Sequence, residues 1–167
     1  MSAVKVLFDG DVIEIGGEVF HHHRNGGGLV SRNANVAASA YVGPEVMVSG
    51  RAQVLDRVRL EGFVRVSGEA VLKDEVCARD HACFGGKARV SQNAKFSDDV
   101  QVSGSSEISG EVWISGAIRT TGRTRLTGNG RLAGNKLLHN ADIVVSGTFQ
   151  PEAPRQARPR GASAGRG

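Results

Sequence analysis

The sequence has few of the residues that build disulfide frameworks, aromatic cores or membrane spans. Of its 167 residues only two are cysteines, Cys77 and Cys83, and aromatic residues make up 5%. Two cysteines at this spacing form neither a disulfide scaffold nor a CxxC zinc motif, and free thiols are typical of a reducing compartment. No apolar run approaches the roughly 20 residues that span a bilayer, and no basic region followed by a long apolar stretch begins the chain. We therefore expect a cytoplasmic protein with no membrane span and no secretory signal.

The positive charge is concentrated at the C-terminus. The formal net charge is +4, but residues 150–167 carry most of it, so the remainder of the chain is close to neutral. This segment is rich in Pro, Gly and Ala and has no large apolar side chain, so we predict that it is a disordered tail. Its arginines are candidates for weak contact with a polyanion, and they are Arg155, Arg158, Arg160 and Arg166.

The first 28 residues have the pattern of two short strands and a joint. The segments KVLFDGDVIEI and GEVFHHH have the composition of short strands. Asp9-Gly10, within the first segment, and Gly16-Gly17, between the two, are turn signals, which favours a β-hairpin cap. The NGGG sequence at 25–28 indicates a flexible joint. His21 and His23 fall on one side of the second strand, so they are candidate metal ligands, although a polar strand end has the same residue types.

An apolar residue returns at every sixth position over most of the chain. These anchors are Val30, Val36, Val42, Val48, Val54, Leu60, Val66, Leu72, Ala78, Phe84, Val90, Phe96, Val102, Ile108, Ile114, Thr120, Leu126, Leu132, Leu138 and Val144. Only Thr120 among them is polar and only Ala78 is small. The position four after each anchor is also small or apolar as far as Ile118. Neither the helical period of 3.6 nor the strand period of two gives this spacing.

A six-residue period predicts one short strand and one corner in each hexad. In the A-x-V unit the outer two residues share one strand face, and the residues that follow turn a corner. Three hexads would close a triangular coil of 18 residues, so about six coils would stack by parallel strand pairing. Residues 18 apart agree with this, because Gly50, Gly68, Gly86, Gly104 and Gly122 fall on one corner, where glycine tolerates positive φ. The sequence therefore predicts an all-β, parallel, triangular β-helix over residues 29–149.

The repeat resembles that of the hexapeptide-repeat proteins, of the bacterial transferase or isoleucine-patch type. The units that carry the resemblance are VSGRAQ, VSGEAV, FGGKAR, VSQNAK and VSGSSE. The stretch HRNGGGLVSRNANVAASAYVGP is also similar to the beginning of uncharacterised, acyltransferase-like β-helix proteins of bacteria and phages. The resemblance covers about residues 30–149, and it implies a left-handed β-helix that forms a homotrimer.

The resemblance implies two kinds of catalytic site. Acyltransferases of the family bind acyl-CoA between subunits and use a histidine. Here His81 would be the general base, with Asp99 stacked beside it one coil later, and a solvated surface pair is the alternative interpretation. Carbonic anhydrases of the γ class share the fold and hold Zn²⁺ with three histidines at the trimer interface, whereas the regular coils here offer His81 alone. No inserted loop interrupts the hexads, and such a loop is the family's usual means of building a substrate pocket.

One outer column alternates aromatic and basic residues. Its members are Tyr41, Arg59, Cys77, Lys95, Trp113 and Arg131. Such a column could stack on and neutralise a nucleic acid or a polysaccharide, and the same residue types are enriched at subunit interfaces. Because the family is trimeric, we favour the interface.

The uninterrupted coils favour a non-catalytic scaffold, which self-associates or presents a flat face to a partner and needs no cofactor. An acyltransferase with a site between subunits is the alternative from a different functional class. A zinc-dependent lyase of the carbonic anhydrase kind and a filament former of the bactofilin kind are further hypotheses.

Overall fold

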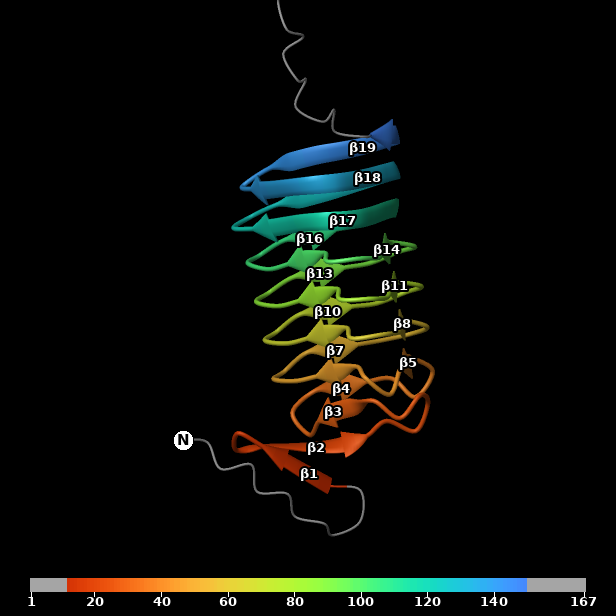
Figure 1. The fold of residues 1–167 in the computed structure, drawn as a ribbon, viewed down its shortest axis with the longest axis vertical. Coiled ribbons are helices and arrows are strands. Elements are labelled where there is room, and N and C mark those ends of the chain that lie inside the picture. The colour runs from red at the N-terminus through yellow and green to blue at the C-terminus, as the bar shows by residue number, and fades with distance from the viewer. Residues whose placement is uncertain (1–11, 150–167) are drawn as a thin grey trace, which may run out of the picture.

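The structure, a computed structural model, describes residues 12–149, and all of its regular elements are strands. A hairpin of β1 (Val12–Ile15) and β2 (Glu18–His22) covers one end of a tall stack of coils (Figure 1). The short strands of the stack are β3 (Leu29–Ser31), β4 (Asn35–Val36), β5 (Tyr41–Val42), β6 (Met47–Val48), β7 (Gln53–Val54), β8 (Arg59–Leu60), β9 (Arg65–Val66), β10 (Val71–Leu72), β11 (Cys77–Ala78), β12 (Cys83–Phe84), β13 (Arg89–Val90), β14 (Lys95–Phe96), β15 (Gln101–Val102) and β16 (Glu107–Ile108). Three long strands complete it: β17 (Glu111–Thr121), β18 (Arg125–His139) and β19 (Asp142–Phe149). None of these elements is a helix, so the described part of the chain has no helix that could cross a membrane.

From β3 to β14, each short strand pairs in parallel with the strand three further along the chain, and β15 and β16 pair in the same way with the long strands β17 and β18. Gln53 is aligned with Val71, and Val71 with Arg89, so one circuit takes 18 residues. The circuits stack into a β-solenoid of about seven coils, which confirms the predicted all-β, parallel fold. The sequence predicted about six coils over the same residues, 29–149, in which circuits of 18 residues number between six and seven.

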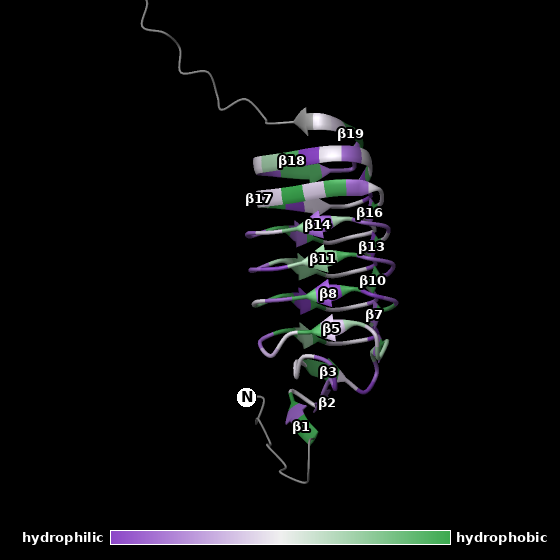
Figure 2. Cartoon of the chain, turned by 90° about the vertical axis from the view of Figure 1, so that its right-hand side faces the viewer, coloured by the Kyte–Doolittle hydropathy of each residue, from purple (hydrophilic) through white to green (hydrophobic). Residues whose placement is uncertain are grey.

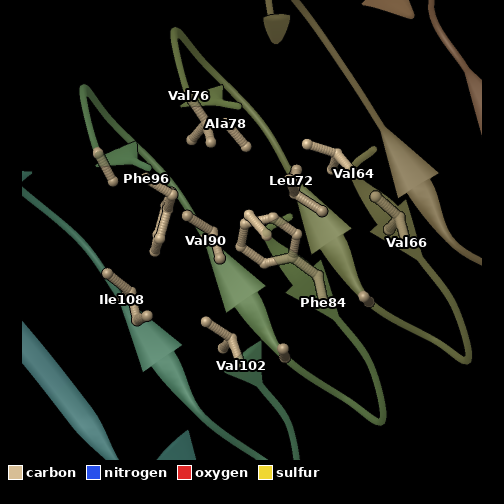
Figure 3. Packing of buried hydrophobic residues seen from close by; sticks show 14 of the residues in the cluster. Val64, Val66, Leu72, Val76, Ala78, Phe84, Val90, Phe96, Val102 and Ile108 are labelled. Carbon is tan, nitrogen blue, oxygen red and sulfur yellow. The ribbon is translucent and has the colours of Figure 1, made fainter. Parts of the chain in front are cut away.

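The anchors fill the interior of the solenoid. From Val42 to Leu138 every sixth residue is buried, and Figure 3 shows several of them directed toward one another between the strands. Phe84 and Phe96 meet edge to face, with ring centroids 4.9 Å apart. The polar anchor Thr120 is also fully buried. Its hydroxyl donates a hydrogen bond to Ser106 Oγ at 3.1 Å, so burial leaves this polar group with a partner. The six-residue spacing therefore identified the core.

The corners of the coils have left-handed backbone conformations. On the predicted glycine corner the φ angles lie between 65° and 74°. A Cβ atom on Gly86 would lie 2.8 Å from the carbonyl oxygen of Gly104, so both the conformation and the close stacking require glycine here. Stacked glycines on one corner confirm the 18-residue register.

The last coil departs from the predicted register by one residue. Leu126 pairs with Ile143, a separation of 17 instead of 18. As a result Val144, which the hexad count places in the core, is 72% exposed, and Val145 is buried in its place. The series of uninterrupted hexads is therefore wrong at its final member, because the chain loses one residue between β18 and β19.

The N-terminal hairpin is bonded to the first coils. Gly16 and Gly17 both have positive φ, as a two-residue hairpin turn requires, and β2 pairs antiparallel with β3. The Glu18 carboxylate accepts a hydrogen bond from the Gly50 N–H at 2.7 Å, which satisfies the first glycine of the stacked corner. Asp9-Gly10 and the predicted tail lie outside the described residues.

The glycines of the joint have a packing role. A Cβ atom on Gly26 or Gly28 would lie within 2.3 Å of backbone oxygens on the coil beside it. The Gly28 N–H also donates to the Val42 carbonyl oxygen at 3.0 Å. Close approach, and not the flexibility that the sequence suggested, explains these glycines.

Candidate functional surfaces

The solenoid holds the predicted aromatic–basic column (Tyr41, Arg59, Cys77, Lys95, Trp113 and Arg131) on successive coils of one face. Consecutive members are aligned partners in parallel strand pairs. Figure 2 presents this face to the viewer, with β5, β8, β11 and β14 one above another. The column is therefore continuous, and its length is about 24 Å at the usual spacing of strands.

The aromatic rings of the column each lie under an arginine. The guanidinium carbon of Arg59 lies 5.3 Å from the centroid of the Tyr41 ring, and that of Arg131 lies 4.4 Å from the centroid of the Trp113 ring. Both distances fit cation–π contacts. Trp113 remains 38% exposed, and its indole Nε1–H donates to Ser97 Oγ at 3.4 Å. The column thus presents rings whose orientation is already fixed.

The Arg59 side chain is also held by Glu61, two residues further along the chain. Its Nε–H donates to the Glu61 carboxylate at 2.6 Å. This hydrogen bond and the negative charge of Glu61 raise the pKa of Arg59, so the guanidinium stays charged throughout the physiological range. A hollow of about 420 Å³ opens on the same face next to Trp113 and Lys95.

His81 and Asp99 lie side by side on another face, as the sequence predicts. The atoms His81 Nδ1 and Asp99 Oδ1 are 3.7 Å apart, and both side chains are mostly exposed. Phe63 stacks on the imidazole, with ring centroids 5.3 Å apart and planes 10° from parallel. A separation of 3.7 Å is too long for a hydrogen bond, so this geometry gives two exposed polar side chains in loose contact beside an aromatic ring.

The histidines near the joint are held by backbone groups. His22 Nδ1 lies 2.8 Å from the Gly27 carbonyl oxygen, and His23 Nδ1 lies 3.1 Å from that of Asn25. His21 lies within β2, where it is aligned with Val30 of β3. Across residues 12–149 no group of three or more His, Cys, Asp or Glu side chains is arranged to hold a metal ion.

A chain of three polar side chains near the C-terminal end was missed by the sequence analysis. Thr121 Oγ1 lies 3.0 Å from His139 Nδ1, and His139 Nε2 lies 2.9 Å from Asn140 Nδ2. Thr121 and His139 are 18 residues apart and aligned in β17 and β18, so the 18-residue register could have revealed the pair.

The hydrogen-bond roles in this chain argue against a nucleophile and its base. Asn140 Oδ1 accepts the Arg123 backbone N–H at 2.8 Å, which leaves Nδ2 to donate to His139 Nε2. The imidazole proton is then on Nδ1, where it donates to the Thr121 hydroxyl. An imidazole in this tautomer cannot accept the hydroxyl proton, so we assign the network to fixing the last corner.

A third surface runs beside the glycine corner. A hollow of about 700 Å³ there is lined by four cations, by two carboxylates and by small residues. The cations are Lys87, Arg89, Arg123 and Arg125, and the carboxylates are Glu107 and Asp142. The sequence did not reveal this hollow, because its shape depends on which of the neighbouring side chains are short.

Comparison with known proteins gives no name to these surfaces: no family model matches the chain, and no curated protein matches it significantly. The function of these surfaces is therefore inferred from their geometry.

Proposed function

We propose that this protein is a non-catalytic interaction module that associates with further copies of itself through the aromatic–basic column. The observation that carries the proposal is the pair of cation–π contacts on one flat face, Arg59 over Tyr41 and Arg131 over Trp113. Such prearranged side chains lose little conformational entropy when a partner covers them. Tyr, Trp and Arg are also the residue types that dominate the binding energy of interfaces.

The shape of the solenoid supports a symmetric assembly. A parallel stack has straight faces whose outer side chains are spaced by the strand pairing. A trimer of the kind that the hexapeptide resemblance implies, with a left-handed coil in each subunit, would bring one such face from each copy toward a common axis. No loop has to move for this contact to form.

Sedimentation velocity of the full chain tests the proposal. We expect a trimer for the wild type and a shift to monomer for Trp113→Glu, because the substitution removes the indole that Arg131 covers and adds a carboxylate that the interface would have to desolvate. Leu137→Glu is the matched control, since Leu137 is 68% exposed on a different face. A monomeric wild type, or dissociation by Leu137→Glu alone, would contradict the proposal.

A second candidate is acyl transfer with His81 as the general base. The observation that favours it is the placement of His81 between Asp99 and Phe63, since a carboxylate can orient an imidazole for proton transfer. Calorimetric titration with acetyl-CoA tests it: binding that is lost in His81→Gln would support this candidate, and an absence of heat at saturating donor would exclude it.

A further inference from the structure

Cations recur at every second coil along the glycine corner. The column that follows the corner glycines consists of Arg51, Glu69, Lys87, Ser105 and Arg123; we call it the glycine-corner column. Its members are stacked directly, because the backbone N–H of each of the first four donates to a glycine carbonyl of the next coil at 2.7–2.8 Å. Arg51, Lys87 and Arg123 are therefore separated by two coils each, about 10 Å along the axis.

These three cations are available to a ligand. All three side chains are exposed, and none of them forms an ion pair within residues 12–149. The two carboxylates of the larger hollow, Glu107 and Asp142, flank Arg125 in the neighbouring column. Arg125 forms an ion pair with Glu107 at 3.2 Å, so part of this negative charge is already compensated within the neighbouring column.

Two hollows join along this column. The hollow of about 700 Å³ is lined by Lys87, Ser105 and Arg123, among others. A second hollow of about 340 Å³ is lined by Arg51, Glu69 and Lys87. Lys87 and Arg89 line both hollows, so the two are adjacent along the solenoid axis, and together we call them the groove. The short side chain of Ser105 lies between the long side chains of Lys87 and Arg123.

The spacing of the cations selects the class of ligand. One nucleic-acid strand in a duplex presents a phosphate about every 3.4 Å of axis, so two of every three phosphates would meet no cation of the column. Some of these phosphates would lie against the Glu69 carboxylate, where like charges repel. The two hollows also lack aromatic lining residues on which bases would stack. In an extended polysaccharide each pyranose advances by about one coil spacing, so an acidic group on every second sugar would meet every cation.

We propose that the groove along the glycine-corner column binds an acidic polysaccharide in which acidic and neutral sugars alternate. The carboxylates or sulfates of the acidic sugars would lie at Arg51, Lys87 and Arg123. The intervening Glu69 and Ser105 would accept hydrogen bonds from hydroxyl groups of the neutral sugars. Cations and hydrogen-bond acceptors thus alternate along the column with the same period as acidic and neutral sugars along the ligand.

Isothermal titration of the full chain with hyaluronan fragments, in which uronic acid and neutral sugar alternate, tests this inference. We expect binding that weakens with salt and is stronger than binding to polygalacturonate, dextran or oligo(dT). Lys87→Gln and Arg123→Gln should each weaken binding about tenfold, the effect of losing one charge-assisted hydrogen bond. Arg79→Gln is the matched control: it removes one exposed cation elsewhere and should change nothing.

A rearranged variant separates spacing from charge. Ser105→Arg combined with Arg123→Ser keeps the number of cations but places two of them on adjacent coils. We expect this variant to lose hyaluronan affinity about as much as Arg123→Gln. All variants retain the C-terminal arginines, so a contribution from the tail is constant.

Several results would overturn the inference. These are an absence of hyaluronan binding, an equal or higher affinity for oligo(dT), an equal loss in Arg79→Gln, or full affinity in the rearranged variant. Circular dichroism of each variant confirms that the fold is intact, which is expected because the substituted side chains are exposed.

Discussion

At the scale of single residues, most corners of this solenoid meet one conformational requirement with glycine or aspartate. The backbone must adopt positive φ where each coil turns, and glycine does so without a steric penalty. Aspartate also visits this conformation, and here its carboxylate accepts a hydrogen bond from the next coil. Asp74 (φ 67°) accepts the Gln92 N–H at 2.9 Å, and Asp98 (φ 65°) accepts the Gly116 N–H at 2.9 Å. Each aspartate thereby links its own coil to the next.

The adjacent residues Gly85 and Gly86 allow the requirement for glycine at a corner to be measured. Gly86→Ala should lower the free energy of unfolding by about 2–4 kcal/mol, because the new Cβ is strained at positive φ and meets Gly104 backbone atoms at 2.8–3.0 Å. Gly85→Ala should cost less than about 1 kcal/mol, since only Ser67 Oγ lies near, at 3.3 Å. Urea denaturation of both variants measures the difference. Equal losses of unfolding free energy would contradict the requirement for glycine at the stacked corner.

The smallest anchor has a similarly specific environment. Ala78 is aligned with Leu60 below and Phe96 above, and Phe96 also contacts Phe84. Ala78→Leu should therefore cost about 1–3 kcal/mol of stability by overpacking. Ala117→Leu is the control, because Ala117 is exposed and should be neutral within about 0.5 kcal/mol. A thermal midpoint unchanged in Ala78→Leu would show that this layer has unfilled space.

At the scale of elements, both ends of the stack are built differently from its middle. The N-terminal hairpin supplies the Glu18 carboxylate to the Gly50 N–H, and its Val19 carbonyl oxygen accepts the Arg32 N–H at 2.9 Å. At the other end the corners at Gly116 and Gly134 lie inside the long strands β17 and β18. The coils there become nearly continuous strands, because glycine alone lets a strand bend without a separate turn.

Removing the hairpin contact should weaken the first coils. Glu18→Ala is expected to cost about 1–3 kcal/mol, the penalty for leaving the Gly50 N–H without its charged acceptor. Glu14→Ala in the adjacent strand is the control. Amide hydrogen exchange is the measurement: the Gly50 amide should exchange faster in Glu18→Ala, and unchanged protection would refute the role of this contact.

The shortened last coil predicts opposite outcomes for two neighbouring valines. Val144→Asp should be tolerated, because the side chain is 72% exposed. Val145→Asp should destabilise β19 by about 2 kcal/mol or more, since a carboxylate would replace a buried apolar side chain. Thermal unfolding distinguishes the two variants. A lower melting temperature for Val144→Asp than for Val145→Asp would contradict the shortened coil and favour an uninterrupted six-residue register.

These examples show which features the sequence could predict. The buried anchors and the glycine corner follow from spacing alone, because both depend on neighbours 18 residues apart. The shift at Val144 did not follow, since three apolar residues in a row at 143–145 fit either register. The Glu18–Gly50 bond joins the hairpin to a coil far along the chain, and no local pattern encodes it.

The candidate surfaces were predictable to a similar degree. The aromatic–basic column could be read from the 18-residue period. The cation–π geometry at Trp113 and the shape of the groove at Ser105 depend on side-chain conformations, which the period does not specify.

At the scale of the whole molecule, one geometric rule creates every surface discussed above. Because the coils stack in parallel with a fixed register, each position of the repeat becomes a straight column on the outside. A column of one chemical character is then an extended linear site, suited to another flat face or to a linear polymer. The aromatic–basic column and the glycine-corner column are two such sites on different faces, so self-association and ligand binding need not compete.

The central claim, that residues 18 apart are vertical neighbours, is tested most directly by pulsed electron paramagnetic resonance. Spin labels would be placed at Asn35 and Glu107, and at Asn35 and Arg125, with Cys77 and Cys83 replaced by serine and unlabelled protein added in excess. The account predicts backbone separations of about 19 Å and about 24 Å, four and five coils, so the second pair should be longer by about one strand spacing. Equal distances for the two pairs would contradict the stacked register and, with it, both proposed surfaces.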